Sequence, residues 1–345
     1  MNTVRLPAEW EPQDAILIAF PSAKSDWFTY WDDIISCYVN IIKVLASYQP
    51  LIIICDNEDE LRTFLKDQDL SNIKIIKQNI NDTWTRDYAA ITVQRDEEFV
   101  LYDFMFNGWG LKFAADKDNQ INKHLWETGL FNAKEKIIQD LVLEGGSIES
   151  DGKGTLMTTS NCLLSPNRNP HLSKDFIEEK MKNIFGLQQI LWLENGHLVG
   201  DDTDSHIDTL ARFCDENTIA YLQCTDPNAM HYADFKKMEM ELKEFKTLDG
   251  KPYELVPLPL TEAIFAKDDN RQLPASYANF LIMNDVVLMP TYNVPQDAVA
   301  LEQLQKAFSK SSKRVEGIDC RALILQHGSL HCITMQFPKG SIKMN

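Results

Sequence analysis

The feature of this chain that most restricts its fold is a loose internal repeat, in which two short strands are followed by a helix and a third strand. The segment GTLMTTSNCLLSPN (154–167) has the pattern of a strand pair. A helix is predicted next over 173–185, with Ser173 as its N-cap, and QQILWLE (188–194) predicts a strand after it. Such a unit leaves apolar faces uncovered, so it needs neighbours of the same kind.

Four more segments follow the same order. NFLIMNDVVLMPTYN (279–293) predicts a strand pair around a tight Asn284-Asp285 turn; a helix that begins near a proline follows, and RALILQ (321–326) is expected as the closing strand. The other copies are the strand pair in 209–224 with a helix over 231–246 and the strand YELVPLPL, the pair in 91–106 with IIQDLVLE, and the opening AILIAF with a helix over 30–47 and PLIIICD. Five units with one helix each indicate radial repetition in an α/β fold, and an ordinary α/β sandwich is the alternative.

Composition narrows the class of protein further. No linker or low-complexity block divides the 345 residues, so we expect one compact domain over 1–345. No stretch reaches the ~20 apolar residues of a membrane span, and the N-terminus has no signal-peptide pattern, so we expect a cytoplasmic protein that does not bind membranes. A net charge of −17 without a basic stripe argues against nucleic-acid binding and weakly favours cationic ligands.

The seven cysteines are too widely spaced for a zinc ribbon, and their odd number in a cytosolic chain argues against a disulfide framework. Most of them lie in apolar runs, where a reduced thiol behaves as a small core residue. Cys332 differs because it lies in HGSLHCITMQFP (327–338), where it could be a nucleophile, a metal ligand or a buried thiol.

Polar, chemically capable residues gather in the connections between the repeats, where a scaffold usually presents its reactive groups. Within DDTDSHIDTLARF (201–213), His206 and Asp208 would share one face if this segment were a strand. A metal site is possible there in principle, but no HExxH motif or Cys/His quartet accompanies it, so no metal is predicted. The other three segments are NDTWTRDYAA (81–90) with Trp84 and Asp87, FNGWG (106–110) with Trp109, and LEGGSIESDGKGT (143–155) with Glu144.

Together these segments offer a thiol, an imidazole and several carboxylates, without a phosphate-binding loop or a serine elbow. Paired carboxylates suit a cation, above all a planar guanidinium, whose N–H groups match carboxylate geometry. The residues therefore favour a cysteine-dependent enzyme that acts on a guanidine.

The ordered set of motifs resembles the agmatine deiminase and bacterial peptidyl-arginine deiminase family of guanidino-group-modifying enzymes. The resemblance spans about residues 5–338 and implies the five-bladed, pseudo-fivefold α/β-propeller known as the pentein fold. The matching motifs are Trp84-Thr-Arg86-Asp87, FNGWG, EGGSIESDGKGT, T-x-x-C-L-L with N-R-N-P in 159–170, TDSHIDTLARF and HCITMQFP.

The resemblance also implies a role for each matched residue. Cys332 would be the nucleophile, His206 the general acid and base, and Glu144 the partner that orients His206. Asp87 and Asp208 would hold the guanidinium nitrogens, and no metal or organic cofactor would be needed. The resemblance also implies five substrate-binding residues. They are Trp84, Trp109 and Asp202, together with Gly328 and Ser329 in the loop just before the nucleophile.

The implied reaction is hydrolysis of agmatine to N-carbamoylputrescine and ammonia through a covalent thiouronium on the cysteine, as in polyamine synthesis. The alternatives are a deiminase of arginine or peptidyl arginine and, more remotely, a non-catalytic binder of polyamines or guanidines. Substrates with a carboxylate would need an arginine partner, for which Arg86, Arg168 and Arg271 are the candidates. A homo-oligomer, dimeric or larger, is compatible with such an enzyme, but no sequence feature selects its size.

The chain also departs from the family pattern. The glycine run usual before the nucleophile is reduced to His327-Gly328-Ser329, and Ser205 and Thr209 flank the His206 motif where the family has Gly and Asn. Tyr88-Ala89-Ala90 follows Asp87 in place of a Gly-Pro sequence. Because glycines let a backbone approach a ligand closely, these changes bear on substrate identity more than on the reaction.

Overall fold

The computed structural model describes residues 3–343, and its strands form five sheets of three or four strands. Each sheet contains at least one antiparallel pair and at least one parallel pair, and a helix lies in each parallel crossover. The first unit consists of β17 (Met335–Pro338), β2 (Gln13–Ala19), α1 (Trp31–Tyr48) and β3 (Leu51–Cys55), and the second of β5 (Ile91–Arg95), β6 (Glu98–Met105), α5 (Ile121–Glu127) and β7 (Glu135–Val142). The third consists of β8 (Ile148–Ser150), β9 (Thr155–Thr159), α7 (Lys174–Phe185) and β10 (Gln189–Leu193), and the fourth of β11 (Ala211–Asp215), β12 (Thr218–Gln223), α8 (Tyr232–Glu244) and β13 (Glu254–Pro259). The fifth consists of β14 (Leu281–Ile282), β15 (Val286–Thr291), α9 (Gln296–Ala307) and β16 (Arg314–Asp319). The predicted α/β fold of five repeated units is confirmed.

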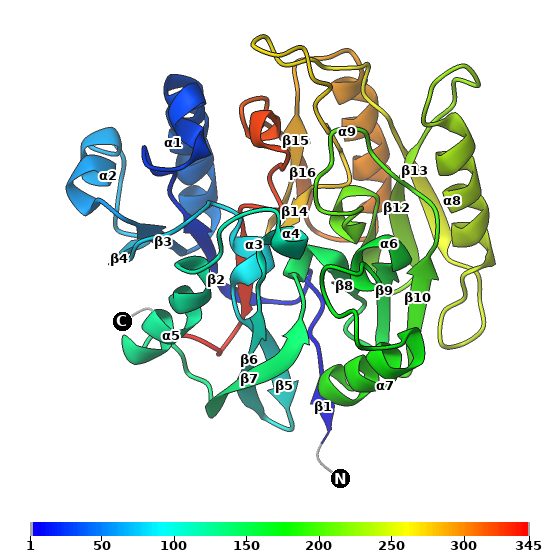
Figure 1. Cartoon of the computed structure of the whole chain (residues 1–345), viewed down its shortest axis with the longest axis horizontal. Coiled ribbons are helices and arrows are strands. Elements are labelled where there is room, and N and C mark those ends of the chain that lie inside the picture. Colours follow the sequence, from blue (N-terminus) through cyan, green and yellow to red (C-terminus); the bar gives the residue numbers. More distant parts are fainter. Residues whose placement is uncertain (1–2, 344–345) are drawn as a thin grey trace.

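The helices of the five units lie around the outside of the molecule, and the sheets lie inside them (Figure 1). Shorter elements extend the units or connect them. These are β1 (Val4–Arg5), β4 (Ile73–Lys77), α2 (Glu58–Phe64), α3 (Thr85–Tyr88), α4 (Gly108–Leu111), α6 (Ser160–Leu163) and the 3-10 helices η1 (Asp26–Tyr30), η2 (Asp118–Gln120), η3 (Gly145–Ser147), η4 (Ile207–Thr209) and η5 (Leu323–Gln326).

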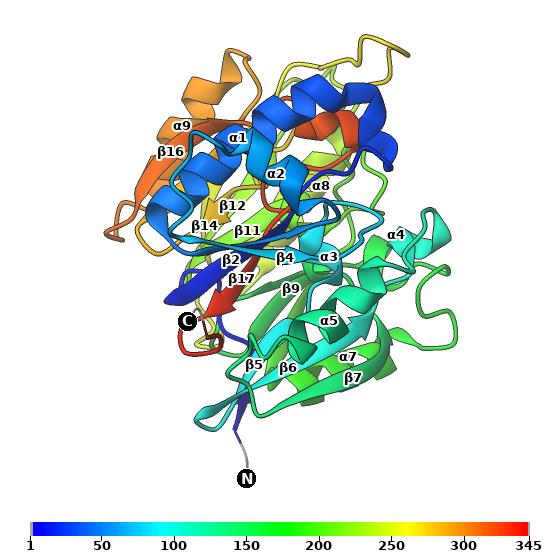
Figure 2. The ribbon, with the colours of Figure 1, turned by 90° about the vertical axis from the view of Figure 1, so that its left-hand side faces the viewer.

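The two ends of the chain close the ring of units. The last strand, β17, pairs antiparallel with β2, so that Met335 lies opposite Leu17. Figure 2 shows the red β17 beside the blue β2. The first unit is therefore complete only when residues from both ends of the sequence are in place.

Helix α7 shows how sequence determines one unit. The Ser173 side chain accepts a hydrogen bond from the Phe176 N–H, as its N-cap position predicted, and the apolar side chains at Ile177, Met181 and Phe185 share the buried face. The helix ends at Gly186, where φ is 69° and a Cβ atom would lie 1.8 Å from the Val4 carbonyl oxygen. Only glycine fits this position.

Two sequence predictions for secondary structure are wrong. The RALILQ segment contains η5 (Leu323–Gln326), and the closing strand of its unit is β16 (Arg314–Asp319), which comes before it. The segment 154–167 holds one strand, β9, followed by α6, because Thr159 accepts from the Cys162 N–H and begins a helix. Short apolar runs fit a strand and a buried turn equally well, so periodicity could not separate them.

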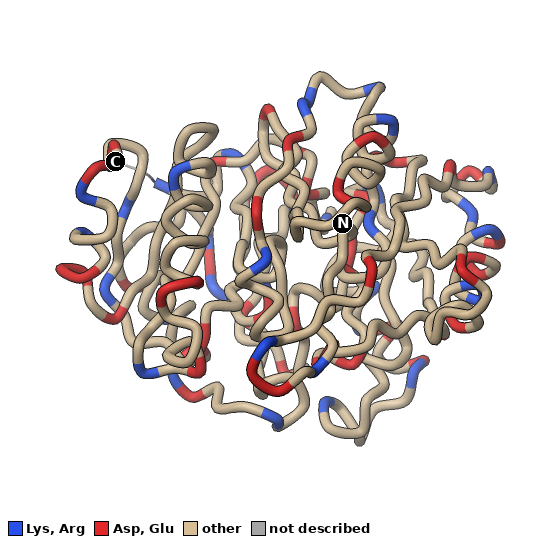
Figure 3. Tube along the Cα trace, turned by 90° about the horizontal axis from the view of Figure 1, so that it is seen from above, with Lys and Arg blue, Asp and Glu red and all other residues tan. Residues whose placement is uncertain are grey.

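Charged residues of both signs are mixed along the Cα trace, with blue Lys and Arg positions interspersed among red Asp and Glu positions (Figure 3). Within residues 3–343, no helix has the length and apolar character that a bilayer crossing requires.

Candidate active site

The connections that enter each unit meet at one site, and each supplies one or two polar groups. Asp87 lies in α3 just before β5, and Glu144 lies between β7 and η3 just before β8. His206 and Asp208 lie at η4 just before β11, and Cys332 lies just before β17. The connection into the remaining unit carries Asn279 just before β14. The repeat thus delivers its polar groups to equivalent positions of five sheets.

Cys332 is buried, with 5% of its surface exposed, and its sulfur has two oxygen neighbours. Its Sγ lies 3.4 Å from Asn279 Oδ1 and 3.8 Å from Asp208 Oδ2. Burial raises the pKa of the thiol well above its usual value, and the charges of Asp208 and Asp87 raise it further. In the free protein the thiol is therefore protonated, and a cation between these carboxylates would favour the thiolate.

His206 is completely buried between two carboxylates. Its Nε2 lies 3.2 Å from Glu144 Oε2, and its Nδ1 lies 3.6 Å from Asp87 Oδ1 without a hydrogen-bond partner. Burial alone would lower the pKa of this imidazole, but the charge of Asp87 and the interactions with Cys162 and Glu144 outweigh it and raise the pKa well above its usual value. An imidazolium can donate a proton, so the geometry suits a general acid.

Asp87 is fixed by two donors, which leave its carboxylate beside His206. Its Oδ2 accepts from Trp109 Nε1 at 2.8 Å, and its Oδ1 accepts from the Gly146 N–H at 2.9 Å. Burial raises the pKa of Asp87 to about 6, although the His206 charge opposes this shift. The carboxylate is therefore ionised at neutral pH and able to bind a cation.

Asp208 is held by His331 on one oxygen and is open on the other. Oδ2 lies 2.8 Å from His331 Nδ1, whereas Oδ1 is buried without a hydrogen-bond partner. Burial raises the pKa of Asp208, but the hydrogen bond and charge of His331 outweigh it and lower the pKa below its usual value. An ionised, unpartnered oxygen in a buried site is a place for a donor from a ligand.

The thiol and Asp87 line a cavity with four of the five predicted substrate-binding positions, namely Trp84, Trp109, Asp202 and Gly328. A Cβ atom on Gly328 would lie 2.3 Å from the Trp84 ring, so glycine is required for this indole to reach the cavity. Trp109 has φ of 55°, next to Gly110 at 83°, which explains its setting between glycines. The rest of the lining is Asp26, Asp82, Phe113, Thr203, Gln326 and His327.

Two sequence expectations about the site need correction. The segment of His206 and Asp208 is not a strand, because Ile207–Thr209 form the 3-10 helix η4; its turn brings both side chains to the site. The side chains of His206 and Asp208 both lie next to Gly146, where a Cβ atom would be 2.6 Å from His206 Nδ1 and 3.1 Å from Asp208 Oδ2. Ser329 does not line the cavity, since its hydroxyl pairs with Tyr292 Oη at 2.8 Å, but a hydrogen bond from its backbone lowers the pKa of Cys332.

Glu144, Cys162 and His206 offer three ligand atoms that lie within 4.8 Å of one another, a set that could in principle hold a divalent cation. However, the Arg168 Nε lies 3.0 Å and 2.7 Å from the two oxygens of Glu144. This buried guanidinium already neutralises the carboxylate, and the cluster is better described as an ion pair that orients His206.

Sequence reasoning gave no role to Asn279 and considered Arg168 only as a candidate partner for a substrate carboxylate. Asn279 Oδ1 accepts from the backbone N–H groups of His331 and Cys332, and its Nδ2 donates to the Asp208 carbonyl. Asn279 could have been found from its place in the repeat, directly before the strand pair. Arg168 stands in the N-R-N-P motif, and its buried contact with Glu144 required the fold.

Gly146 gives a sharp test of this geometry. We expect Gly146→Ala to reduce kcat/KM by roughly 10²-fold or more, because the new methyl would displace Asp87 and His206 from their positions. The melting temperature and steady-state kinetics of the variant check this result. Gly129→Ala is the matched control: its Cβ would meet nothing within 4 Å, but its φ is 73°, so it should lose stability and keep activity. Full activity in Gly146→Ala would contradict the geometry.

A ring of five α/β units that brings a cysteine, a histidine and paired aspartates into one buried site defines the pentein class of guanidino-group-modifying hydrolases. Within this class, the chain belongs to the Porphyromonas-type peptidyl-arginine deiminase family, whose model matches residues 5–338.

Individual relatives are similar in sequence to this protein over nearly the whole length of the chain. It is 30% identical to an agmatine deiminase of Pseudomonas aeruginosa, over 97% of this chain and 95% of the relative. It is 38% identical to a C. jejuni agmatine deiminase, solved as a cysteine-to-serine variant with substrate bound, with a TM-score of 0.91 and coverage of 98% and 97%. A crystal structure with the provisional name peptidyl-arginine deiminase is 45% identical, with a TM-score of 0.94 and coverage of 98% and 100%.

Proposed function

We propose that this protein hydrolyses agmatine to N-carbamoylputrescine and ammonia through a covalent thiouronium on Cys332. The observation that carries this proposal is the charge of the cavity. Among the residues 3–343, its lining includes four aspartates but neither lysine nor arginine. Such a cavity suits a substrate that is cationic at both ends and has no carboxylate. The four are Asp26, Asp82, Asp87 and Asp202.

The positions of the three candidate arginines support agmatine over arginine. Arg168 is occupied by Glu144 and Asp204, and Arg271 by Asp269 and the Leu325 carbonyl. Arg86 is turned away toward Met335 and Glu9. None of the three lines the cavity with Cys332, so none is available there to pair with the carboxylate of an amino acid.

The proposed roles follow the contacts. Asp87 and the free oxygen of Asp208 bind the guanidinium nitrogens, Glu144 orients His206, and Asp202 binds the distal ammonium. Burial raises the pKa of Asp202, and a cationic partner would favour the ionised form of this carboxyl group. The walls around the alkyl chain are Trp84, Trp109 and the backbone at Gly328.

The chemistry uses one nucleophile and one proton carrier. With the guanidinium bound, the Cys332 thiolate attacks its central carbon and forms the C–S bond, while His206 donates its proton to the leaving nitrogen, which departs as ammonia. The neutral His206 then takes a proton from water, whose oxygen attacks the thiouronium carbon. The C–S bond breaks as the hydroxyl proton of the adduct passes to solvent, where the released ammonia takes it up as ammonium; the ureido product leaves, and Cys332 returns as the thiolate.

The direct test is a comparison of kcat/KM on agmatine, free arginine and a blocked arginine peptide. We expect agmatine to exceed both others by about 10²-fold or more, because a carboxylate or peptide group would meet aspartates at the outer end of the cavity. Asp202→Asn should lower kcat/KM for agmatine about tenfold, mainly through KM, because one charge contact is lost. The exposed Asp226→Asn is the control and should have no effect.

Faster turnover of arginine or of the peptide would overturn the substrate assignment and favour the alternative that the family name suggests. Tight agmatine binding without product from any substrate would support a non-catalytic binder.

The wider setting is also a proposal. The closed ring of five units is consistent with one catalytic domain over 1–345. All seven cysteines are free thiols, as suits a reducing cytoplasm. Assembly into a dimer or a larger homo-oligomer stays a prediction, which light scattering would measure.

A further inference from the structure

His331, directly before Cys332, lies between two carboxylates. Its Nδ1 is 2.8 Å from Asp208 Oδ2 and its Nε2 is 2.7 Å from Glu9 Oε2, and only 1% of its side chain is exposed. An ionised carboxylate can only accept a hydrogen bond, so both ring nitrogens must donate. An imidazole that donates from both nitrogens carries a positive charge.

Both carboxylates have cationic neighbours other than His331. Burial alone would raise the pKa of Glu9, but the charge of Arg212 is the largest of the effects that outweigh it, and the pKa is lowered far below its usual range. Arg212 Nη2 lies 2.8 Å from Glu9 Oε2, and the Ile282 N–H donates to Glu9 Oε1 at 2.7 Å. Burial raises the pKa of Asp208, and the charges of His206 and Arg212 are among the effects that lower it.

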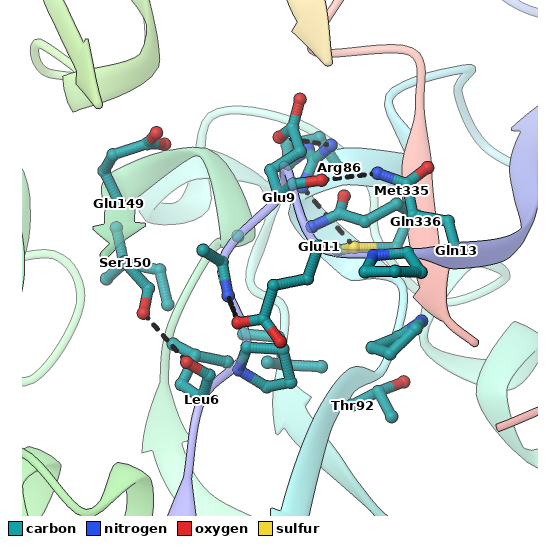
Figure 4. Close-up of a pocket in the computed structure, with 17 residues that line it drawn as sticks. Leu6, Glu9, Glu11, Gln13, Arg86, Thr92, Glu149, Ser150, Met335 and Gln336 are labelled. Atoms are coloured by element: carbon teal, nitrogen blue, oxygen red, sulfur yellow. Dashed lines mark hydrogen bonds and ion pairs between the residues drawn. The ribbon is translucent and has the colours of Figure 1, made fainter. Parts of the chain in front are cut away.

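Glu9 lies outside the substrate cavity. It lines a second cavity of about 60 Å³, where Figure 4 shows it beside Arg86 and Met335. Arg86 lines this second cavity, whereas the adjacent Asp87 lines the one with Cys332. His331 joins Glu9 in the second cavity to Asp208, whose Oδ2 lies 3.8 Å from the Cys332 sulfur.

The charges of this buried cluster balance only when His331 is protonated on both nitrogens. Three acidic groups then face three basic groups, and the net charge is zero. They are Glu9, Glu149 and Asp208 against Arg86, Arg212 and His331.

The backbone prevents His331 from leaving this position. Its N–H donates to the Asn279 carbonyl and to Asn279 Oδ1, and its own carbonyl accepts from the Thr334 N–H and hydroxyl. The ring is thus part of the same rigid turn that carries the nucleophile.

We propose that His331 is a positioning residue for the nucleophile, acting as an imidazolium that holds Asp208 and offsets its negative charge. The inference rests on the proposed function, because it assigns Cys332 as the nucleophile. By engaging Oδ2, His331 leaves Oδ1 of Asp208 for the guanidinium. By offsetting a charge 3.8 Å from the sulfur, it favours the thiolate that attacks.

The test is the pH dependence of Cys332 alkylation by iodoacetamide without substrate, followed by mass spectrometry of the Cys332 peptide. His331→Gln keeps one N–H donor for Asp208 but has no charge. We expect its alkylation profile to move to higher pH by about one unit, which is roughly tenfold slower alkylation at pH 7. Glu9→Gln should also move the alkylation profile to higher pH, but by less than His331→Gln does. It removes the carboxylate that accepts from Nε2 of His331, so this second ring nitrogen no longer has to be protonated.

The exposed His171→Gln is the matched control and should keep the wild-type profile. An unchanged profile in folded His331→Gln would overturn the proposal. If that variant does not fold, the ¹⁵N imidazole spectrum of the wild-type protein at pH 7 decides, with the His331 signals identified by their shift in Glu9→Gln. Two protonated nitrogens would support the inference, and one protonated nitrogen would refute it.

These outcomes separate the inference from the proposed function. A shifted alkylation profile in a protein that turns over no guanidine would leave the role of His331 intact while the substrate assignment fails. Turnover of agmatine with no shift would sustain the function and remove this role of His331.

Discussion

Cys332→Ala is expected to reduce turnover of agmatine by roughly 10⁴-fold or more, because no other group near the substrate cavity could form the covalent intermediate. Cys162, the other thiol close to His206, lies 3.6 Å from Glu144 Oε2 and does not line the cavity. Binding should persist, since the residues that contact the cation remain. Isothermal titration with agmatine and steady-state assays of the ureido product measure the two properties separately.

Cys37→Ser is the control for this prediction. Cys37 lies in α1, where its thiol donates to the Asp319 carbonyl, and it is outside the cavity lining. Its loss should leave kcat unchanged. If Cys332→Ala kept wild-type turnover, the nucleophile assignment and the covalent mechanism would both be wrong.

His206→Ala is expected to lower kcat by about 10² to 10⁴-fold, the usual contribution of a general acid and base. Both chemical steps should slow, because in the proposed mechanism the same imidazole protonates the leaving ammonia and later activates water. Rapid-quench experiments with mass detection would measure formation and decay of the thiouronium on Cys332. The removal of His206 should also raise the pKa of Asp87, since the His206 charge lowers it in the wild-type protein.

His124→Ala, in α5, is the control for a histidine outside the site. A kcat of His206→Ala within tenfold of wild type would transfer the acid and base role to another group, for which the cavity offers His327.

Much of the site could be predicted from sequence because its reactive residues lie in short, distinctive connections. Cys332, His206 and Asp87 each stand beside polar or glycine-rich residues that a plain strand or helix would not contain. The sequence also placed these residues in the connections between repeated units, and the five sheets confirm the repeated units.

Other features required the folded chain. The partner of His331, Glu9, is 322 positions away and lies in a segment with no recognisable motif. Ser329 shares its loop with Gly328, but whether a side chain faces a substrate or Tyr292 depends on the turn of the backbone. Residues that act through long-range contacts leave no local pattern, so sequence spacing does not reveal them.

The pairing of β17 with β2 has a consequence for synthesis of the protein. The ribosome completes β2 long before it makes the partner strand β17 and Cys332, because Leu17 pairs with Met335. Until then, one edge of the apolar strand AILIA is unpaired, and such an edge can pair with another chain. A chain that stops before this segment therefore lacks the thiol and exposes a strand prone to aggregation, so the nucleophile and the protection of that edge arrive together when β17 is made.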